Sequence, residues 1–445
     1  MGVVFTSLDG SMPPAPHRLT DLPSTNPAAA YAADVMRVDR ISIGTQDDCW
    51  LILTHALSRF AQLSAEELCG LIPETADSLA VSALALGLPP SSRIMRAARA
   101  LRRLHDDSSE SAGGSDAVSE IVLATQGVGE ELEIAGGFAL AHAMLAGLLS
   151  AFERRMSSRM RGNVIAQQGR ALRQLGVTDA ARDHYTVAMQ QGYDCDAKDV
   201  VARALLGLAV IGLTRGNYPA AREQFERALA NADLANDPDL IRSAHHGLMN
   251  CGFASGDLDA AMVHGWNVLR LCIAPDSRAE ALMNMAEICR LTGEHDAALR
   301  VFVVAVEWTS VPRVRLHALS GALSSAVTLG RLADARRYAA TIADILPDAA
   351  DAYTRASITI EVADSMQRLG EAAEASSLLS EALAIATSAA FHELVHRAEQ
   401  MAAQWQTTVH PVVPGGAEVP HRKPRRSEHF RTVLRSLNGL TAASL

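Results

Sequence analysis

The feature that most constrains the fold is a glycine that recurs through the second half of the chain. Six such glycines stand 40, 40, 37, 37 and 40 residues apart, and an alanine follows each of them five residues later. The pairs are Gly176 and Ala181, Gly216 and Ala221, Gly256 and Ala261, Gly293 and Ala298, Gly330 and Ala335, and Gly370 and Ala375. A fixed period of this length is the signature of repeat architectures, in which each unit packs on its neighbours.

Each period predicts a hairpin of two helices. The glycine ends the first helix because it adopts the left-handed backbone, and the small alanine lets the second helix approach its neighbour closely. Nine residues after the glycine, four units carry a large side chain, namely Tyr185, Phe225, Phe302 and Leu379. Hydrophobic residues make up 49% of the chain but aromatic ones only 4%, so alanine and leucine supply the apolar content. That mixture favours helices over strands.

Two segments carry the full pattern and resemble a known repeat. Residues 205–229 contain Gly216, Ala221 and Phe225 in sequence, and a second set is Gly293, Ala298 and Phe302. Both segments resemble units of the tetratricopeptide repeat (TPR) family, over roughly residues 120–406. The resemblance implies an all-α fold, a right-handed superhelical solenoid of helical hairpins, here with a small helical N-terminal domain. The family's period of 34 residues is shorter, so longer helices or turns are expected, and HEAT-like stacking is the structural alternative.

Composition shifts divide the rest of the chain. Gly136 lies forty residues before Gly176 and Ala141 follows it, which predicts a degenerate seventh hairpin. Clusters of Pro, Gly and Ser predict breaks in helical structure. The expected organisation is a disordered arm at 1–30, a helical domain at 31–105, a linker at 106–116, a solenoid of six or seven repeats with a capping helix at 117–406, a flexible linker at 407–427 and an amphipathic tail at 428–445.

The concave side of the solenoid is the predicted site. By analogy with the family, side chains thirteen, ten, six and three residues before each turn glycine point into this groove. The predicted groove residues are Arg170, Arg173, Arg203, Leu206, Val210, His246, Asn250, Phe253, Met283, Glu287, Arg290, His317, Asp364 and Gln367. Charged groups, amides and a few apolar anchors suit an extended or helical peptide. Ordinary solvated helix faces would look similar.

A catalytic or metal site is not predicted. The sequence has no glycine-rich phosphate loop, no His-Glu-x-x-His motif and no nucleophile elbow. His245, His246 and His264 are interpreted as packing or surface residues, because adjacent helical residues point about 100° apart. We therefore expect a non-catalytic protein- or peptide-binding adaptor or sensor, without cofactor or metal.

A bacterial transcription regulator is the first alternative. Residues 79–104 resemble a degenerate helix-turn-helix, in which Arg93, Arg96, Arg99 and Arg103 would contact nucleic acid. The motif needs an aliphatic residue six positions after Gly87, but Arg93 stands there and Ile94 is seventh. A plain amphipathic helix explains the segment better, and the net charge of -10 also argues against a nucleic-acid-coating protein. A structural assembly scaffold is the second alternative.

The tail combines a basic cluster at 421–426 with an apolar helical face made by Phe430, Val433, Leu434 and Leu437. It predicts a docking peptide for an acidic surface or a membrane, or a segment that folds back into the groove. No apolar run approaches the roughly 18 residues needed to cross a bilayer. Scattered single cysteines and the lack of a leader pattern predict a cytoplasmic protein. Abundant arginine and alanine weakly favour a bacterial source.

Overall fold

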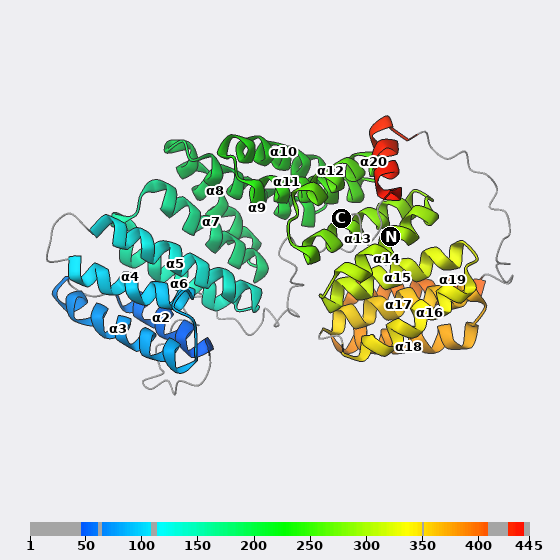
Figure 1. Cartoon of the computed structure of the whole chain (residues 1–445), viewed down its shortest axis with the longest axis horizontal. Helices are drawn as coiled ribbons and strands as arrows, with labels where there is room; N and C mark the ends of the chain where they lie inside the picture. Colours follow the sequence, from blue (N-terminus) through cyan, green and yellow to red (C-terminus); the bar gives the residue numbers. More distant parts are fainter. Residues whose placement is uncertain (1–45, 61–64, 108–113, 349–350, 408–425, 440–445) are drawn as a thin grey trace. The chain divides into compact units, whose positions relative to one another are not determined.

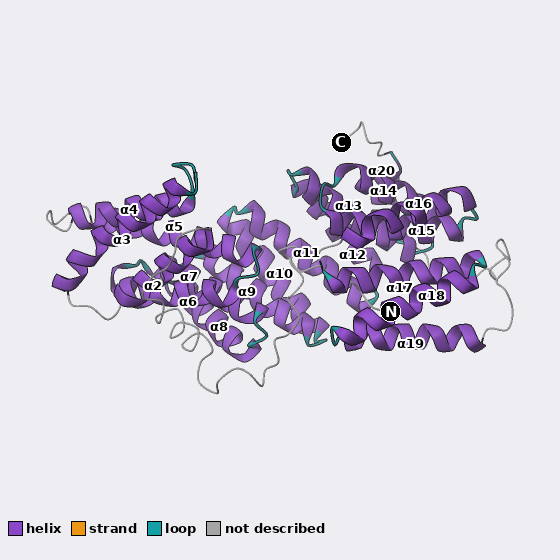
Figure 2. Ribbon diagram, turned by 90° about the horizontal axis from the view of Figure 1, so that it is seen from below, coloured by secondary structure: helices purple, strands orange, loops and turns teal. Residues whose placement is uncertain are grey.

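The computed structural model describes residues 46–60, 65–107, 114–348, 351–407 and 426–439. Within these ranges the regular elements are all helices, as predicted (Figure 2). The predicted arm at 1–30 and most of both predicted linkers lie outside the described residues. Among the described helices, none is both long enough and apolar enough to cross a membrane.

The chain forms two compact units, which we call the N-unit and the C-unit, with the division between residues 244 and 245. The described helices of the N-unit are α2 (Gln46–Phe60), α3 (Ala65–Ala85), α4 (Arg93–Asp107), α5 (Gly114–Ile134), α6 (Phe138–Phe152), α7 (Ser158–Gln174), α8 (Thr178–Asp194), α9 (Lys198–Thr214) and α10 (Tyr218–Ala235). Helix α11 (Pro238–Ser255) contains the division.

The described helices of the C-unit that follow α11 are α12 (Leu258–Leu271), α13 (Pro275–Leu291), α14 (His295–Trp308), α15 (Pro312–Thr328), α16 (Leu332–Ile345), α17 (Ala352–Leu369), α18 (Ala372–Ser388), α19 (His392–Thr407) and α20 (Glu428–Asn438).

The recurring glycines form the turns of the hairpins, as expected. Gly136, Gly176, Gly216, Gly256, Gly293, Gly330 and Gly370 all have φ between 69° and 85°. We call α5, α7, α9, α11, α13, α15 and α17 the first helices, and α6, α8, α10, α12, α14, α16 and α18 the second helices. Every alanine five residues after a turn glycine is fully buried. The chain is therefore an all-helical protein built of consecutive hairpins (Figure 1).

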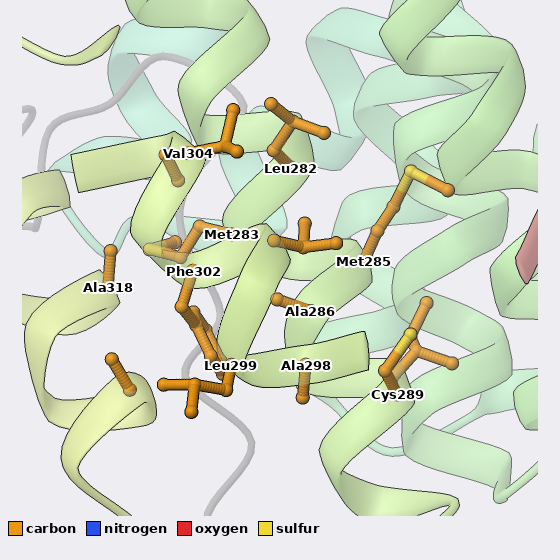
Figure 3. Packing of buried hydrophobic residues seen from close by; sticks show 14 of the residues in the cluster. Leu282, Met283, Met285, Ala286, Cys289, Ala298, Leu299, Phe302, Val304 and Ala318 are labelled. Carbon is orange, nitrogen blue, oxygen red and sulfur yellow. The ribbon is translucent and has the colours of Figure 1, made fainter. Parts of the chain in front are cut away.

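Neighbouring hairpins pack through an aromatic ring against a glycine. A Cβ atom added to Gly207 of α9 would lie 2.1 Å from a ring carbon of Tyr185 in α8. At Gly321 of α15 the same atom would lie 2.3 Å from the ring of Phe302. Figure 3 shows Phe302 in the C-unit core with Met283 and Leu299. A glycine on one hairpin thus makes room for the aromatic side chain of the previous one.

The N-terminal helices share a core with the first predicted hairpin. Gly87, with φ of 69°, forms the turn between α3 and α4, α4 packs on α5, and α2 packs on α6. Residues from Trp50 to Val164 form one apolar cluster. The segment predicted as a linker therefore connects two helices that contact each other. The domain boundaries stay a prediction.

Candidate peptide-binding face

The fourteen predicted groove residues all lie on first helices. Eleven of them are half-buried, whereas Leu206, His246 and Met283 are only 6–8% exposed. These three stand ten residues before a turn glycine. At about 100° per residue, that position is rotated by about 60° from the position thirteen before the glycine, toward the packed side of the helix. The other eleven predicted residues retain solvent-accessible surface.

Polar contacts join neighbouring first helices in the N-unit. Asn163 of α7 donates a hydrogen bond from Nδ2 to Asp199 Oδ2 of α9, at 3.3 Å, and Arg159 forms an ion pair with Asp199 at 3.1 Å. Arg203 donates from Nε to Asn163 Oδ1 at 3.3 Å. One helix pair earlier, Arg170 Nε lies 2.6 Å from Glu133 Oε2. The side chains of this face hold each other in place across adjacent hairpins.

Arg203 is a partly buried cation that has no ion pair among the described residues. Burial lowers the pKa of this guanidinium and the positive charge of Arg170 lowers it further, whereas the negative charges of Asp237, Asp199 and Glu130 act in the opposite direction. Among the described residues, no carboxylate oxygen lies within 4 Å of Arg203, and its one hydrogen bond goes to the amide of Asn163. A partly dehydrated cation with unused donors is a suitable point for a ligand carboxylate.

The C-unit carries an equivalent row on α13, α15, α17 and α19. Ser320 donates to Glu361 Oε2 at 2.6 Å, and Arg397 forms an ion pair with the same carboxylate at 3.6 Å. Arg313 pairs with Glu280 at 3.6 Å. Two of these contacts join the first helices of neighbouring hairpins, as in the N-unit, and the contact of Arg397 joins α17 to the last helix of the row, α19.

Two predicted groove residues, His317 and Arg290, have shifted pKa values in this row. Burial lowers the pKa of His317 below its usual value, although the negative charge of Glu361 acts in the opposite direction. The carboxylate of Glu287 accepts from Arg290 Nε at 2.8 Å and raises the pKa of that guanidinium. A neutral imidazole between charged neighbours can donate and accept hydrogen bonds, as peptide groups require.

Several residues of the face were absent from the predicted set. Arg159, Asp199 and Arg313 stand seventeen residues before a turn glycine, one helical turn before the predicted position at thirteen. Ser320 stands at ten, Glu361 at nine, and Arg397 lies on α19, which has no turn glycine after it. Extending the helical period by one turn would have identified the first three.

The arginines of α4 make contacts within the N-unit. Arg93 pairs with Glu130 at 3.2 Å and donates to the carbonyl of Gly127, and Arg103 pairs with Glu120 at 2.5 Å.

Arg102 pairs with Asp77, and Arg99 donates to the carbonyl of Pro90 at 2.7 Å. Burial raises the pKa of Glu131 overall, and the positive charges of Arg93 and Arg96 act in the opposite direction. Carboxylates of α3 and α5 thus pair with several of the α4 arginines whose positive charge a nucleic-acid reader would need. These pairs do not favour the helix-turn-helix alternative.

Two of the three histidines considered as ligands do approach each other. His245 and His264 place their Nδ1 atoms 3.0 Å apart, whereas His246 is buried. The sequence did not predict the pair that His245 of α11 forms with His264 of α12. Two imidazoles alone are fewer than the ligands of a zinc site.

No protein-family model matches the chain, and no curated protein matches its sequence. Three solved structures show how far the likeness in fold extends. A Rap protein complexed with Competence and Sporulation Factor is 13% identical, covers 81% of this chain and 99% of its own length, and has a TM-score of 0.44. Aspartyl phosphate phosphatase F from Bacillus subtilis is 10% identical, with coverages of 78% and 96% and a TM-score of 0.47. BtubC from P. vanneervenii is 16% identical, with coverages of 48% and 90% and a TM-score of 0.40.

Proposed function

We propose that this chain is a non-catalytic, TPR-like protein that binds a polypeptide segment on the polar face of its first helices. The observation that carries the proposal is the set of half-buried polar side chains on this face, which bond from helix to helix in both units. Such contacts hold donors and acceptors in fixed positions before a ligand arrives, and this lowers the entropy cost of binding.

The ligand should carry at least one carboxylate. Arg203 is a partly dehydrated cation without an ion-pair partner among the described residues, and its hydrogen bond goes to an amide. An acidic side chain or a terminal carboxylate of the bound polypeptide would give this guanidinium a direct ion-pair partner. Asn250 and Gln367, both half-buried, offer amides that can bond to a peptide backbone regardless of its sequence.

The role that follows is an adaptor or sensor in the cytoplasm of a bacterium. Such a protein holds a partner polypeptide and needs no cofactor. The finer assignment to the TPR family rests on the sequence resemblance around Gly216 and Gly293.

A capture experiment with matched variants tests the proposal. The face variant changes Arg203, Asn250 and Asp364 to Ala, and a control variant changes Glu226, Arg227 and Glu381, which are exposed on second helices. Both should keep the helical circular dichroism of the intact chain. From nuclease-treated lysate, the intact chain and the control should retain a specific protein that the face variant loses. Identical profiles from all three baits would contradict the proposal.

A further inference from the structure

The helix α20 packs on the second helices α12 and α14, on the outer side of two hairpins (Figure 1). Phe430, Val433 and Leu437 of α20 are at most 7% exposed and belong to the apolar cluster of the C-unit. Their spacing of three and four residues places them on one helical face. The tail predicted as amphipathic therefore packs on second helices and not on the first-helix face.

The second helices α12 and α14, on which α20 packs, differ from other second helices at two positions. Six residues after the turn glycine, the second helices α12 and α14 carry Met262 and Leu299, both at most 3% exposed. Ten residues after it they carry Trp266 and Val303. The equivalent residues of α8, α10, α16 and α18 are Arg182, Arg222, Arg336 and Ser376, followed by Thr186, Glu226, Ala340 and Ser380. Hairpins of this kind fold with polar or small residues at these positions. Met262, Trp266, Leu299 and Val303, which we call the apolar patch, therefore serve something other than the hairpin itself.

Charged residues at the two ends of the patch select a helix of one direction. Asp259 Oδ2 accepts a hydrogen bond from the backbone N–H of Ser427 at 2.7 Å, at the amino end of α20. Arg300 donates to Asn438 Oδ1 at 2.7 Å, at the carboxyl end. An anion at the amino end and a cation at the carboxyl end both complement the helix dipole.

The first turn of α20 is fixed by its own residues. Ser427 Oγ accepts from the N–H of Phe430 at 3.1 Å and caps the helix. The guanidinium of Arg426 lies 5.3 Å from the centre of the Phe430 ring and forms an ion pair with Asp259 at 3.3 Å. The docked helix thus has a hydroxyl cap of its own, a preceding cation that pairs with Asp259, and apolar residues three, six and ten positions after the cap.

The helix α20 is short enough to dissociate from α12 and α14. Isolated helices of eleven residues are marginal in water, so α20 depends on the patch for its helical structure. Its buried apolar side chains are Phe430, Val433 and Leu437, and Leu434 is partly buried against the same cluster. A competing helix with the same anchors could replace it.

We infer that the outer face of α12 and α14 is a second binding site, for an amphipathic helix of a partner protein, and that α20 is its tethered occupant. The partner helix carries the pattern of α20: a hydroxyl cap preceded by a cation, then an aromatic, a β-branched and a leucine-like anchor. A second copy of this chain is a poorer occupant, because its α20 has only the same affinity as the tethered α20, which has a far higher effective concentration, whereas a partner helix with a higher affinity displaces α20. This site is independent of the first-helix face.

A synthetic labelled peptide of residues 426–439 serves as the probe. In the full chain, Phe430→Asp with Leu437→Asp should release α20, which hydrogen exchange would report as lost protection of residues 428–438 while α13 stays protected. This release variant should bind one probe, and the intact chain should bind it at least tenfold more weakly because α20 occupies the patch. A probe with Asp in place of Phe430 and Leu437 should bind neither.

Two further variants locate the probe. Adding Met262→Arg and Leu299→Arg to the release variant recreates the residue type found at this position in α8 and α10, and should weaken probe binding at least tenfold. Adding Arg203→Ala instead should leave probe binding unchanged, which separates this site from the first-helix face.

The inference is overturned if the release variant keeps α13 protected but does not bind the probe, or if the arginine substitutions leave binding intact. Loss of protection throughout α12, α13 and α14 in the release variant would show that α20 is a fixed part of the core, and would also overturn it. Intact chains that sediment as dimers dissociated by Phe430→Asp would replace the partner protein with a second copy.

Discussion

One contact between hairpins in the N-unit depends on a single glycine that faces an aromatic ring. Gly207 and Gly212 both lie on α9, yet their surroundings differ. A Cβ at Gly207 would meet the Tyr185 ring at 2.1 Å, whereas at Gly212 the nearest atom is Ala221 Cβ at 3.4 Å. The first contact is a clash and the second is ordinary van der Waals contact.

Gly207→Ala should therefore destabilise the chain by about 1–3 kcal/mol, the usual cost of overpacking a core. Gly212→Ala should be neutral or slightly stabilising, because alanine is the better helix former. Urea unfolding followed by circular dichroism compares the two variants. Equal midpoints for both would show that the Tyr185 ring moves aside freely.

His142 of α6 should make stability depend on pH. Burial, with a smaller effect from His184, lowers the pKa of His142 to about 4, against an ordinary value near 6.5. The unfolded chain then binds more protons than the folded one between these two values, so stability is complete above pH 6.5 and falls as the pH decreases toward 4. At pH 5 the loss from this group is on the order of 2 kcal/mol.

His142→Leu should remove this part of the pH dependence. The measurement is the free energy of unfolding at pH 7 and pH 5 for both proteins, since other groups titrate equally in each. The difference between the two pH values should be smaller in the variant by about 2 kcal/mol. Parallel curves would mean that His142 is not buried as a neutral side chain.

The fourteen predicted groove residues show which features of the site family analogy could predict and which it could not. Family analogy placed all fourteen groove residues on first helices, because the distance from a turn glycine fixes the helical phase. It did not show that the residues ten before the glycine, such as Leu206 and Met283, pack against neighbours. Nor could sequence alone reveal that Ser320 and Arg397 share the carboxylate of Glu361, which depends on how three hairpins stack.

At the scale of elements, the turn glycines carry the most local information. A glycine followed by an alanine five residues later predicted each hairpin from Gly136 to Gly370, since backbone conformation and close helix approach are properties of that short segment. The position of α20 was not predictable in this way, although its apolar face was. The informative signal was the pair Met262 and Leu299, at a position where four other second helices carry Arg or Ser.

Gly330, between α15 and α16, allows a direct test of the turn. Its φ is 69°, and an added Cβ would meet no atom within 4 Å, so only backbone strain opposes a side chain there. Gly330→Ala should cost about 1–2 kcal/mol, the penalty for an L-residue in the left-handed region. Gly330→Asn should cost less, because asparagine tolerates this conformation. Thermal unfolding would rank the three proteins, and an alanine variant as stable as the parent would contradict the account.

At the scale of the whole molecule, the chain offers two kinds of surface. The first helices present half-buried polar side chains that bond across hairpins, in the N-unit through Arg203 and in the C-unit through Glu361. The second helices α12 and α14 present an apolar patch with a charge at each end. The first kind of surface suits an extended peptide, and the second suits an amphipathic helix. Both are surfaces that a polypeptide-binding protein would use.

Site-specific photo-crosslinking tests whether the first helices present the face that binds a polypeptide. A photoreactive residue replaces Ser324 or Asp364 on first helices, or Ser380 on the exposed side of α18 as the matched control. After irradiation in nuclease-treated native lysate, the first two positions should capture the same polypeptide, and excess unlabelled chain should compete with capture. The account predicts no such product at Ser380. Capture that is equal at all three positions, or absent from both first-helix positions while the protein stays folded, would contradict it.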